Sequence, residues 1–167
     1  MSEMTDVRKM TPEQKEAFHR DGESRIKAIK VVKPPENARG EPRDVTVQLR
    51  TPAISVLTQW VRQGGEDNLH YHTNGDTFWM VLKGRARYFT VSGPDDKEGT
   101  KLVADLGPHE GVVIPRGSRY WFEKAGDEEL ELLQVVAHEQ GGRKPERINV
   151  APHKDWMTET NLHVYDK

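Results

Sequence analysis

Residues 70–84 read HYHTNGDTFWMVLKG, and this stretch decides how the rest of the chain is interpreted. Two histidines, His70 and His72, stand one residue apart, followed by the turn-like TNGD and an apolar run that ends at Gly84. On a β-strand, residues i and i+2 point to the same face, so the two imidazoles can converge on one metal ion while Tyr71 faces the other way. The alternative is a pair of partly buried histidines that bond to other side chains or water.

Short β-rich runs surround this stretch, from Val45 to His138. They are VTVQL, ISVLTQWV, TFWMVL, ARYFTV, GVVIP, YWF and LELLQVVA, and Gly, Pro, Asn or Asp punctuates many of the joins. Many short strands with frequent turn signals indicate an all-β sandwich or barrel. No long helical pattern interrupts them, which argues against a parallel α/β sheet.

The segment before the strands has a different composition. Thr11-Pro12-Glu13-Gln14 is typical of a helix start, and Asp21-Gly22 predicts that the helix ends near Arg20. Residues 23–29 are also compatible with a second short helical segment. Residues 31–44 are rich in Pro, Gly and charge, which predicts an irregular connection or an extended arm. We expect this region to serve as a structural cover or a dimer contact.

Composition limits the classes of function. The chain has 167 residues, no cysteine and a net charge of -2, so no disulfide can form and any metal must use nitrogen and oxygen ligands. The near-balanced charge gives no reason to expect nucleic-acid or membrane binding. The N-terminal MSEMTDVRKM lacks the apolar core of a signal peptide, which favours a cytoplasmic protein.

The histidine pair and the strands together resemble the cupin superfamily, whose fold is a small antiparallel jelly-roll barrel marked by two motifs. The first motif is a glycine, five residues, His-x-His, three or four residues, a glutamate, six residues and a glycine. Here Gly64, His70, His72 and Gly84 match, while Thr77 takes the position of the glutamate.

The second motif is a glycine, five residues, Pro-x-Gly, two residues and a histidine. Pro115 and Gly117 match it, the leading glycine is displaced to Gly111, and Tyr120 takes the position of the histidine. The resemblance covers about residues 45–138. It implies a cupin barrel there, an N-terminal helical or extended arm over 1–44, a C-terminal extension over 139–167, and a homodimer.

The resemblance also implies one divalent metal ion (Fe, Zn, Mn or Ni) held by His70 and His72. Asp76 is the candidate third ligand, because two histidines and one carboxylate form the facial triad of non-haem Fe(II) enzymes. Strand parity places Asp76 outward unless Asn74-Gly75 forms a bulge, and its alternative role is that of a turn residue. Glu66 is the reserve carboxylate.

Tyr120 is the candidate catalytic residue. Its phenol could bind Fe(III), transfer a proton or orient a substrate, and its alternative role is to fill the space of a lost ligand. Alternation along the strands predicts that Thr77, Trp79, Phe122 and Gln134 line the pocket and contact the substrate, since aromatic walls suit an apolar or planar ligand.

Arg85 and Arg87 alternate with Ala86 and Tyr88. The simpler interpretation sends Ala86 and Tyr88 inward and leaves both arginines in solvent. With the opposite parity, the arginines would clamp a carboxylate substrate.

Three functions follow from these observations. The first is a small-molecule metalloenzyme with oxygenase, isomerase or lyase chemistry. The second is a binding module without catalysis, in which the histidines are hydrogen-bonding groups. The third is a metal-free enzyme of the sugar-epimerase kind, with His70 or His72 and Tyr120 as base and acid.

Overall fold

The computed structural model describes residues 6–35, 40–93, 99–139, 146–151 and 156. The chain divides into two compact units, Met1–Val31 and Val32–Lys167. No helix in these described ranges is long and apolar enough to cross a membrane.

The first unit contains the short 3-10 helix η1 (Val7–Lys9) and the helix α1 (Pro12–Ser24). The predicted start is confirmed: Thr11 accepts from the Gln14 amide, and the Gln14 side chain accepts from the Thr11 amide. The predicted stop was wrong, because α1 continues through Gly22. One glycine costs a helix only about 1 kcal/mol relative to alanine, so a single glycine does not end it. The segment over residues 26–30 is not helical.

The second unit is built of strands. Its described residues form β1 (Arg43–Arg50), β2 (Ile54–Val61), β3 (His70–His72), β4 (Gly75–Lys83), β5 (Arg85–Val91), β6 (Thr100–Leu106), β7 (Gly111–Ile114), β8 (Trp121–Ala125), β9 (Leu130–His138) and β10 (Arg147–Asn149).

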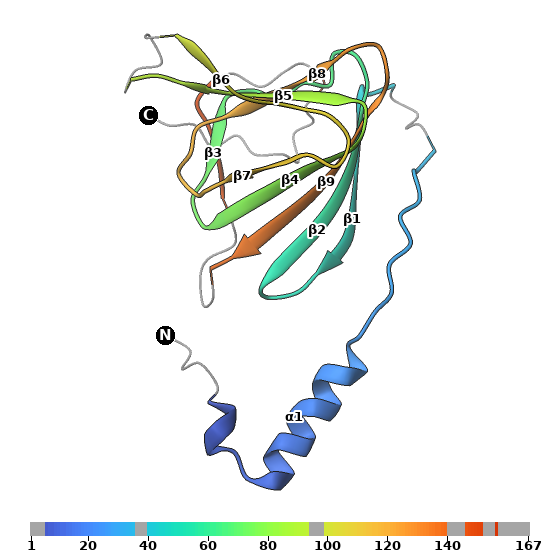
Figure 1. Ribbon diagram of the computed structural model, residues 1–167, viewed down its shortest axis with the longest axis vertical. Coiled ribbons are helices and arrows are strands. Elements are labelled where there is room, and N and C mark those ends of the chain that lie inside the picture. Colours follow the sequence, from blue (N-terminus) through green and yellow to red (C-terminus); the bar gives the residue numbers. More distant parts are fainter. Residues whose placement is uncertain (1–5, 36–39, 94–98, 140–145, 152–155, 157–167) are drawn as a thin grey trace. The chain divides into compact units, whose positions relative to one another are not determined.

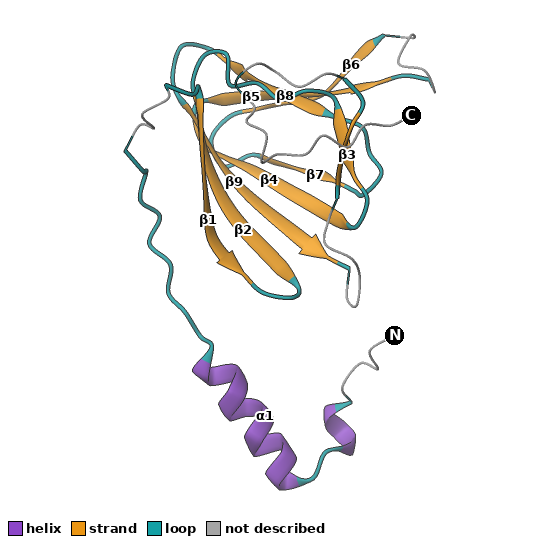
Figure 2. Ribbon diagram, turned by 180° about the vertical axis from the view of Figure 1, so that it is seen from behind, coloured by secondary structure: helices purple, strands orange, loops and turns teal. Residues whose placement is uncertain are grey.

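The strands form a five-stranded sheet in the order β1-β2-β9-β4-β7, a three-stranded sheet in the order β6-β5-β8, and the pair β10-β3. All pairings are antiparallel. In Figure 1 the smaller sheet lies over one end of the larger one, and Figure 2 shows the larger sheet from behind. The predicted antiparallel all-β barrel is therefore confirmed.

The core lies on the inner faces of the two sheets, as alternation predicts. In β4, Thr77, Trp79 and Val81 are buried, whereas Asp76 is exposed. Rings of Trp79, Tyr88 and Phe122 pack together, with centroid distances of 5.5 to 6.2 Å.

The motif glycine Gly84 separates β4 from β5 and has a φ of 78°, which residues with a Cβ rarely adopt. A Cβ at this position would lie 2.8 Å from the Glu129 carbonyl oxygen. The glycine is therefore required by both backbone conformation and space.

Candidate binding pocket

The histidine pair is held by backbone pairing on both sides of β3. The His70 amide donates to the Tyr120 carbonyl at 3.1 Å, and the Tyr120 amide donates to the His70 carbonyl at 2.9 Å. On the other side, β10 places Asn149 opposite His70 and Arg147 opposite His72. The two imidazole centroids lie 5.1 Å apart, and that of His70 lies 4.5 Å from the Tyr120 ring.

The orientation of the His70 ring is fixed by one hydrogen bond. Its Nδ1 lies 2.7 Å from the Asn68 carbonyl oxygen. Because a carbonyl oxygen can only accept, Nδ1 must carry the hydrogen and donate it. This leaves Nε2 as an acceptor, and Nε2 is buried without a partner among the described residues.

Both imidazoles are neutral at physiological pH. Burial lowers the pKa of His70 to about 3, although the neighbouring Asp67 carboxylate acts in the opposite direction. Burial also lowers the pKa of His72 to about 4, and the positive charge of Arg147 adds to the effect. Desolvation disfavours the charged form of a buried histidine. The pair therefore presents lone pairs and N–H groups to the pocket, without positive charge.

Asp67 lies between two guanidinium groups. Its Oδ1 accepts from Arg147 Nη2 at 3.0 Å and lies 3.5 Å from Arg43 Nη1. Its Oδ2 lies 4.0 Å from His70 Nε2. Burial alone would raise the pKa of Asp67, but the two arginines outweigh it and hold the pKa well below its usual range. Asp67 is therefore ionised, and the charges of both arginines are shared by this one carboxylate.

A second polar network fixes Arg147. Its Nε donates to Asn149 Oδ1 at 3.2 Å, and its Nη2 also donates to Asn68 Oδ1. The Asn68 side chain donates in turn to Asn149 Oδ1 at 3.0 Å and to the Ala151 carbonyl at 2.9 Å. The strand β10 thus brings a largely buried arginine to the histidines, where Asp67, Asn68 and Asn149 hold it in place.

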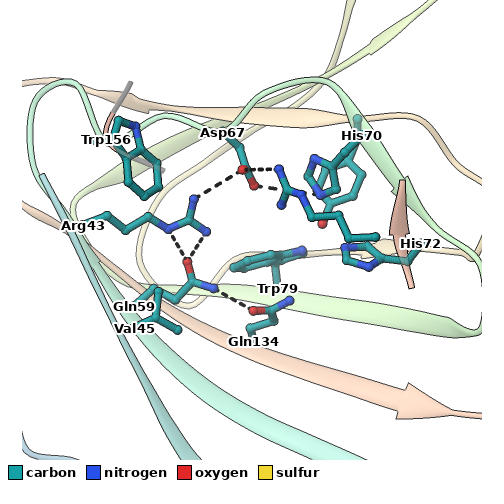
Figure 3. A pocket seen from close by; sticks show the side chains of 11 residues that line it. Arg43, Val45, Gln59, Asp67, His70, His72, Trp79, Gln134 and Trp156 are labelled. Atoms are coloured by element: carbon teal, nitrogen blue, oxygen red, sulfur yellow. Dashed lines mark hydrogen bonds and ion pairs between the residues drawn. The ribbon is translucent and has the colours of Figure 1, made fainter. Parts of the chain in front are cut away.

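Arg43 enters from the start of β1, on the opposite side of the pocket (Figure 3). Its Nε donates to Gln59 Oε1 at 2.8 Å, and the Gln59 amide donates to Gln134 Oε1 at 2.7 Å. The guanidinium lies over the ring of Phe122 at 4.9 Å and over that of Trp156 at 5.5 Å. These contacts hold a cation against aromatic faces, a favourable arrangement in a desolvated site.

The groups line a cavity of about 160 Å³ that is partly open to solvent. Its lining comprises Arg43, Val45, Gln59, Asp67, His70, His72, Trp79, Tyr120, Gln134, Arg147 and Trp156. Besides His70 Nε2, three buried donors belong to the lining: the Trp156 indole N–H, which has no hydrogen-bond partner in the described part of the chain, and the Trp79 indole N–H and Tyr120 hydroxyl, which interact with each other. Burial raises the pKa of Tyr120, so its hydroxyl keeps the proton.

The structure brings together most of the predicted site residues. His70, His72, Trp79, Tyr120 and Gln134 all line the cavity.

Two predicted substrate contacts lie nearby instead of in the lining. Phe122 is buried beneath Arg43, and Thr77 is buried within β4 between its strand neighbours Ile114 and Val136.

Asp76 is not brought to the histidines. β4 begins at Gly75 and pairs with β9 in continuous register as far as Val81, so the bulge that would turn Asp76 inward does not form. The exposed carboxylate accepts from the Arg116 amide at 2.9 Å, as a turn-stabilising residue would. Glu66, the reserve carboxylate, is partly exposed and does not belong to the lining.

The outward interpretation of the two β5 arginines is the one the structure supports. Arg85 and Arg87 are exposed and share the Asp105 carboxylate, at 2.7 and 3.3 Å, whereas Ala86 and Tyr88 are buried. They therefore do not clamp a ligand in the barrel.

The donor set falls short of a metal site. No group of three or more His, Asp or Glu side chains among the described residues could hold a metal ion. The nearest carboxylate, Asp67, is already bound by two guanidinium groups, and these would repel a divalent cation. The residues that the structure describes therefore do not form a complete site for a resident metal.

Sequence reasoning missed the charged half of the pocket. Arg43, Gln59, Asp67, Arg147 and Trp156 come from segments far apart in the chain, and three of them lie outside residues 45–138. A weak signal exists for Arg147, because Arg147-Ile148-Asn149 alternates like a short strand with its polar residues on one face.

Comparison with known proteins agrees with this architecture. Residues 41–157 match the sequence model of the family described as Cupin. No curated protein matches the sequence.

Solved structures add a likeness of fold. An uncharacterized conserved protein with a double-stranded beta-helix domain from Klebsiella pneumoniae is 21% identical, with a TM-score of 0.57 over 81% of this chain and 96% of that one. Oxalate oxidase is 20% identical, with a TM-score of 0.52 over 66% of this chain and 58% of that one. Peruvianin-I, a cysteine peptidase from Thevetia peruviana latex, is 15% identical, with a TM-score of 0.52 over 66% and 70%. The chain thus spans less than two thirds of the oxalate oxidase chain.

Proposed function

Since the chain belongs to the cupin family, we propose that it binds a small molecule in its barrel pocket through its own polar side chains. One observation carries this proposal: the polar atoms of His70, Trp79, Tyr120 and Trp156 are buried around a single cavity, and those of His70 and Trp156 have no partner among the described residues. Leaving such an atom unsatisfied costs about 1–3 kcal/mol. A ligand that supplies the partners would recover this free energy.

The size of the cavity fits a small organic molecule. A cavity of about 150 Å³ holds a molecule the size of benzene, and this one measures about 160 Å³. The ligand is therefore expected to be about the size of benzene or of a small substituted benzene, with one face against the aromatic rings of the lining.

The protonation states favour binding over acid–base catalysis. A general base works best when its pKa is near the working pH, whereas the pKa of His70 is lowered to about 3 by burial. Tyr120, whose pKa is raised by burial, holds its proton too firmly to act as an efficient acid. In the free pocket the two groups serve as a hydrogen-bond acceptor and a hydrogen-bond donor.

A metal-centred enzyme is the second candidate, and the hydrogen bond from His70 Nδ1 to the Asn68 carbonyl favours it. Such a bond is the usual means of orienting a metal-bound imidazole. His70 and His72 would be the ligands, and a metal would supply the Lewis acidity on which oxygenase, isomerase or lyase chemistry depends. The described residues provide only these two ligands beside two guanidinium groups, so no step is assigned to a metal.

The test is a thermal-shift and calorimetric screen of small neutral, anionic and cationic compounds against untagged protein. Tyr120→Phe should weaken a pocket ligand by about fivefold or more, because it removes one hydrogen bond to the ligand. Tyr88→Phe is the matched control, since the Tyr88 hydroxyl is also buried but lies outside the cavity lining. Equal losses in both variants, or no binding of any compound, would overturn the proposal.

Metal analysis of the same preparation distinguishes the metal-centred enzyme from a pocket that binds its ligand without a metal. A stoichiometric metal that disappears when His70 and His72 are both changed to alanine would replace the proposal with a metal-centred one. We expect the metal content of the wild type and of this double variant to be equal.

A further inference from the structure

We propose that the ligand of this pocket is a small hydroxycarboxylate, with its carboxylate against Arg43 and Arg147 and its hydroxyl donating to His70. The inference rests on the proposed small-molecule function and adds the charge and chemical class of the ligand. It is carried by the charges and the hydrogen-bonding capacity of the lining.

The first step is the charge balance of the pocket. Among the described residues, the lining contains two arginines but a single carboxylate, Asp67. The side chains of Arg43, Arg147 and Asp67 are 7%, 13% and 1% exposed, so solvent screens these charges poorly. A buried charge without a counter-charge is strongly unfavourable. The excess of one positive charge therefore favours an anionic ligand over a neutral or cationic one.

The second step is the supply of free donors. Arg147 uses Nε and Nη2 for its bonds within the protein, and its Nη1 has no hydrogen-bond partner among the described residues. Arg43 uses Nε and Nη2 for Gln59, and its Nη1 lies 3.5 Å from Asp67. The two Nη1 groups therefore have N–H donors left for a second carboxylate. Guanidinium groups bind carboxylates through charge-assisted hydrogen bonds, which are roughly twice as strong as neutral ones.

The remaining hydrogen-bonding groups of the lining also favour an anionic ligand. The indole N–H of Trp156 has no acceptor among the described residues, and the Tyr120 hydroxyl, which interacts with Trp79, keeps its own proton for donation. A carboxylate offers about four acceptor sites on its two oxygens and no donor. A donor-rich lining of this kind suits an acceptor-rich ligand.

The third step concerns the one free acceptor, His70 Nε2. It requires a donor on the ligand, and it lies 4.0 Å from the Asp67 oxygen Oδ2, while Oδ1 of the same carboxylate bonds Arg147. The ligand donor must therefore lie within a few bonds of the ligand carboxylate. A hydroxyl meets this need. An ammonium group would bring a positive charge into a pocket that already has an excess of it.

The experiment compares matched probes by isothermal titration calorimetry. Lactate is compared with lactamide, which lacks the charge, and with propionate, which lacks the hydroxyl. Salicylate, salicylamide and benzoate form the aromatic set. In at least one set the acid should bind at least about tenfold tighter than its amide, because the amide leaves the guanidinium charge uncompensated. The same acid should bind about fivefold tighter than its deoxy analogue, the worth of one hydrogen bond.

The outcomes distinguish this inference from the proposed function. If the amide binds as tightly as its acid in both sets, or if neither acid binds while a neutral compound of the screen does, the hydroxycarboxylate assignment is wrong and small-molecule binding stands. If no compound of any class binds, the proposed function fails as well.

Variants of Arg147 test whether this residue binds the ligand carboxylate. Arg147→Gln should abolish the preference for acid over amide, and Arg147→Lys should restore part of it. Arg85→Gln is the control, because Arg85 is exposed and pairs with Asp105 on the outside of the barrel. An unchanged preference in a folded Arg147→Gln protein would refute the placement. The comparison of probes on the wild type decides the ligand class even if Arg147→Gln does not fold, since it needs no variant.

Discussion

Lowering the pH from about 6.5 to about 5 should destabilise this protein through His70. An unperturbed histidine has a pKa near 6.5, whereas burial lowers that of His70 in the folded protein to about 3. Between these values the unfolded chain binds a proton that the folded protein does not, so stability is complete above about pH 6.5 and is lost as the pH falls toward 3. At about 1.4 kcal/mol for each pH unit, the loss down to pH 5 is about 2 kcal/mol.

The groups that face His70 do not cancel this effect. Asp67, at 4.0 Å from Nε2, favours the protonated ring, but burial and the charge of Arg147 oppose it and the net shift is downward. The pKa of Asp67 is itself held well below its usual range, so this carboxylate stays ionised throughout the window. His72, whose pKa burial lowers to about 4, adds a loss of the same sign.

The assay is urea unfolding of the wild type and of His70→Gln at about pH 7, 6 and 5, followed by tryptophan fluorescence. His70→Gln should be the less stable protein at pH 7, and the gap between the two should narrow by about 2 kcal/mol at pH 5 because the variant lacks the titrating ring. His19→Gln, a change at an exposed position on α1, is the control. A gap that stays constant with pH, or that widens as the pH falls, would refute the assignment of His70 as a buried neutral histidine.

Three further predictions concern stability and follow from single contacts. Asp67→Asn should lower the free energy of unfolding by about 3–5 kcal/mol, because it leaves the buried guanidinium of Arg43 and the largely buried one of Arg147 without a counter-charge; Asp76→Asn, the exposed control, should cost about 1 kcal/mol or less in the same denaturation assay. Tyr88→Phe should be neutral or stabilising by about 1 kcal/mol, since its buried hydroxyl has no partner among the described residues, and a clear loss of stability would reveal a bond to that hydroxyl. Gly84→Ala should destabilise by more than about 2 kcal/mol in thermal or urea unfolding, because its φ is 78° and the added Cβ would lie 2.8 Å from a carbonyl oxygen; full stability would contradict the turn geometry.

The sequence could predict those parts of the site that lie on one strand. His70 and His72 share a face because side chains alternate along a strand, and Trp79 is buried for the same reason. Alternation along the same strand also predicted that Asp76 faces outward. The unbroken register from Gly75 keeps this carboxylate outside the barrel. Strand periodicity and glycine turns are properties of short segments, so they can be predicted from the sequence alone.

Only the tertiary structure decided the charge of the pocket. Arg147 and Asp67 are separated by 80 residues, and Arg43 comes from the start of a strand on the other side of the cavity. Each of these residues, read by itself, is typical of a solvated surface. Their burial results from the pairing of β10 with β3 and from the closure of the barrel, contacts that no local pattern encodes. The sequence by itself therefore determined the barrel and the histidine pair, whereas long-range strand pairing determined that the pair faces two arginines in place of the carboxylate that a metal would need.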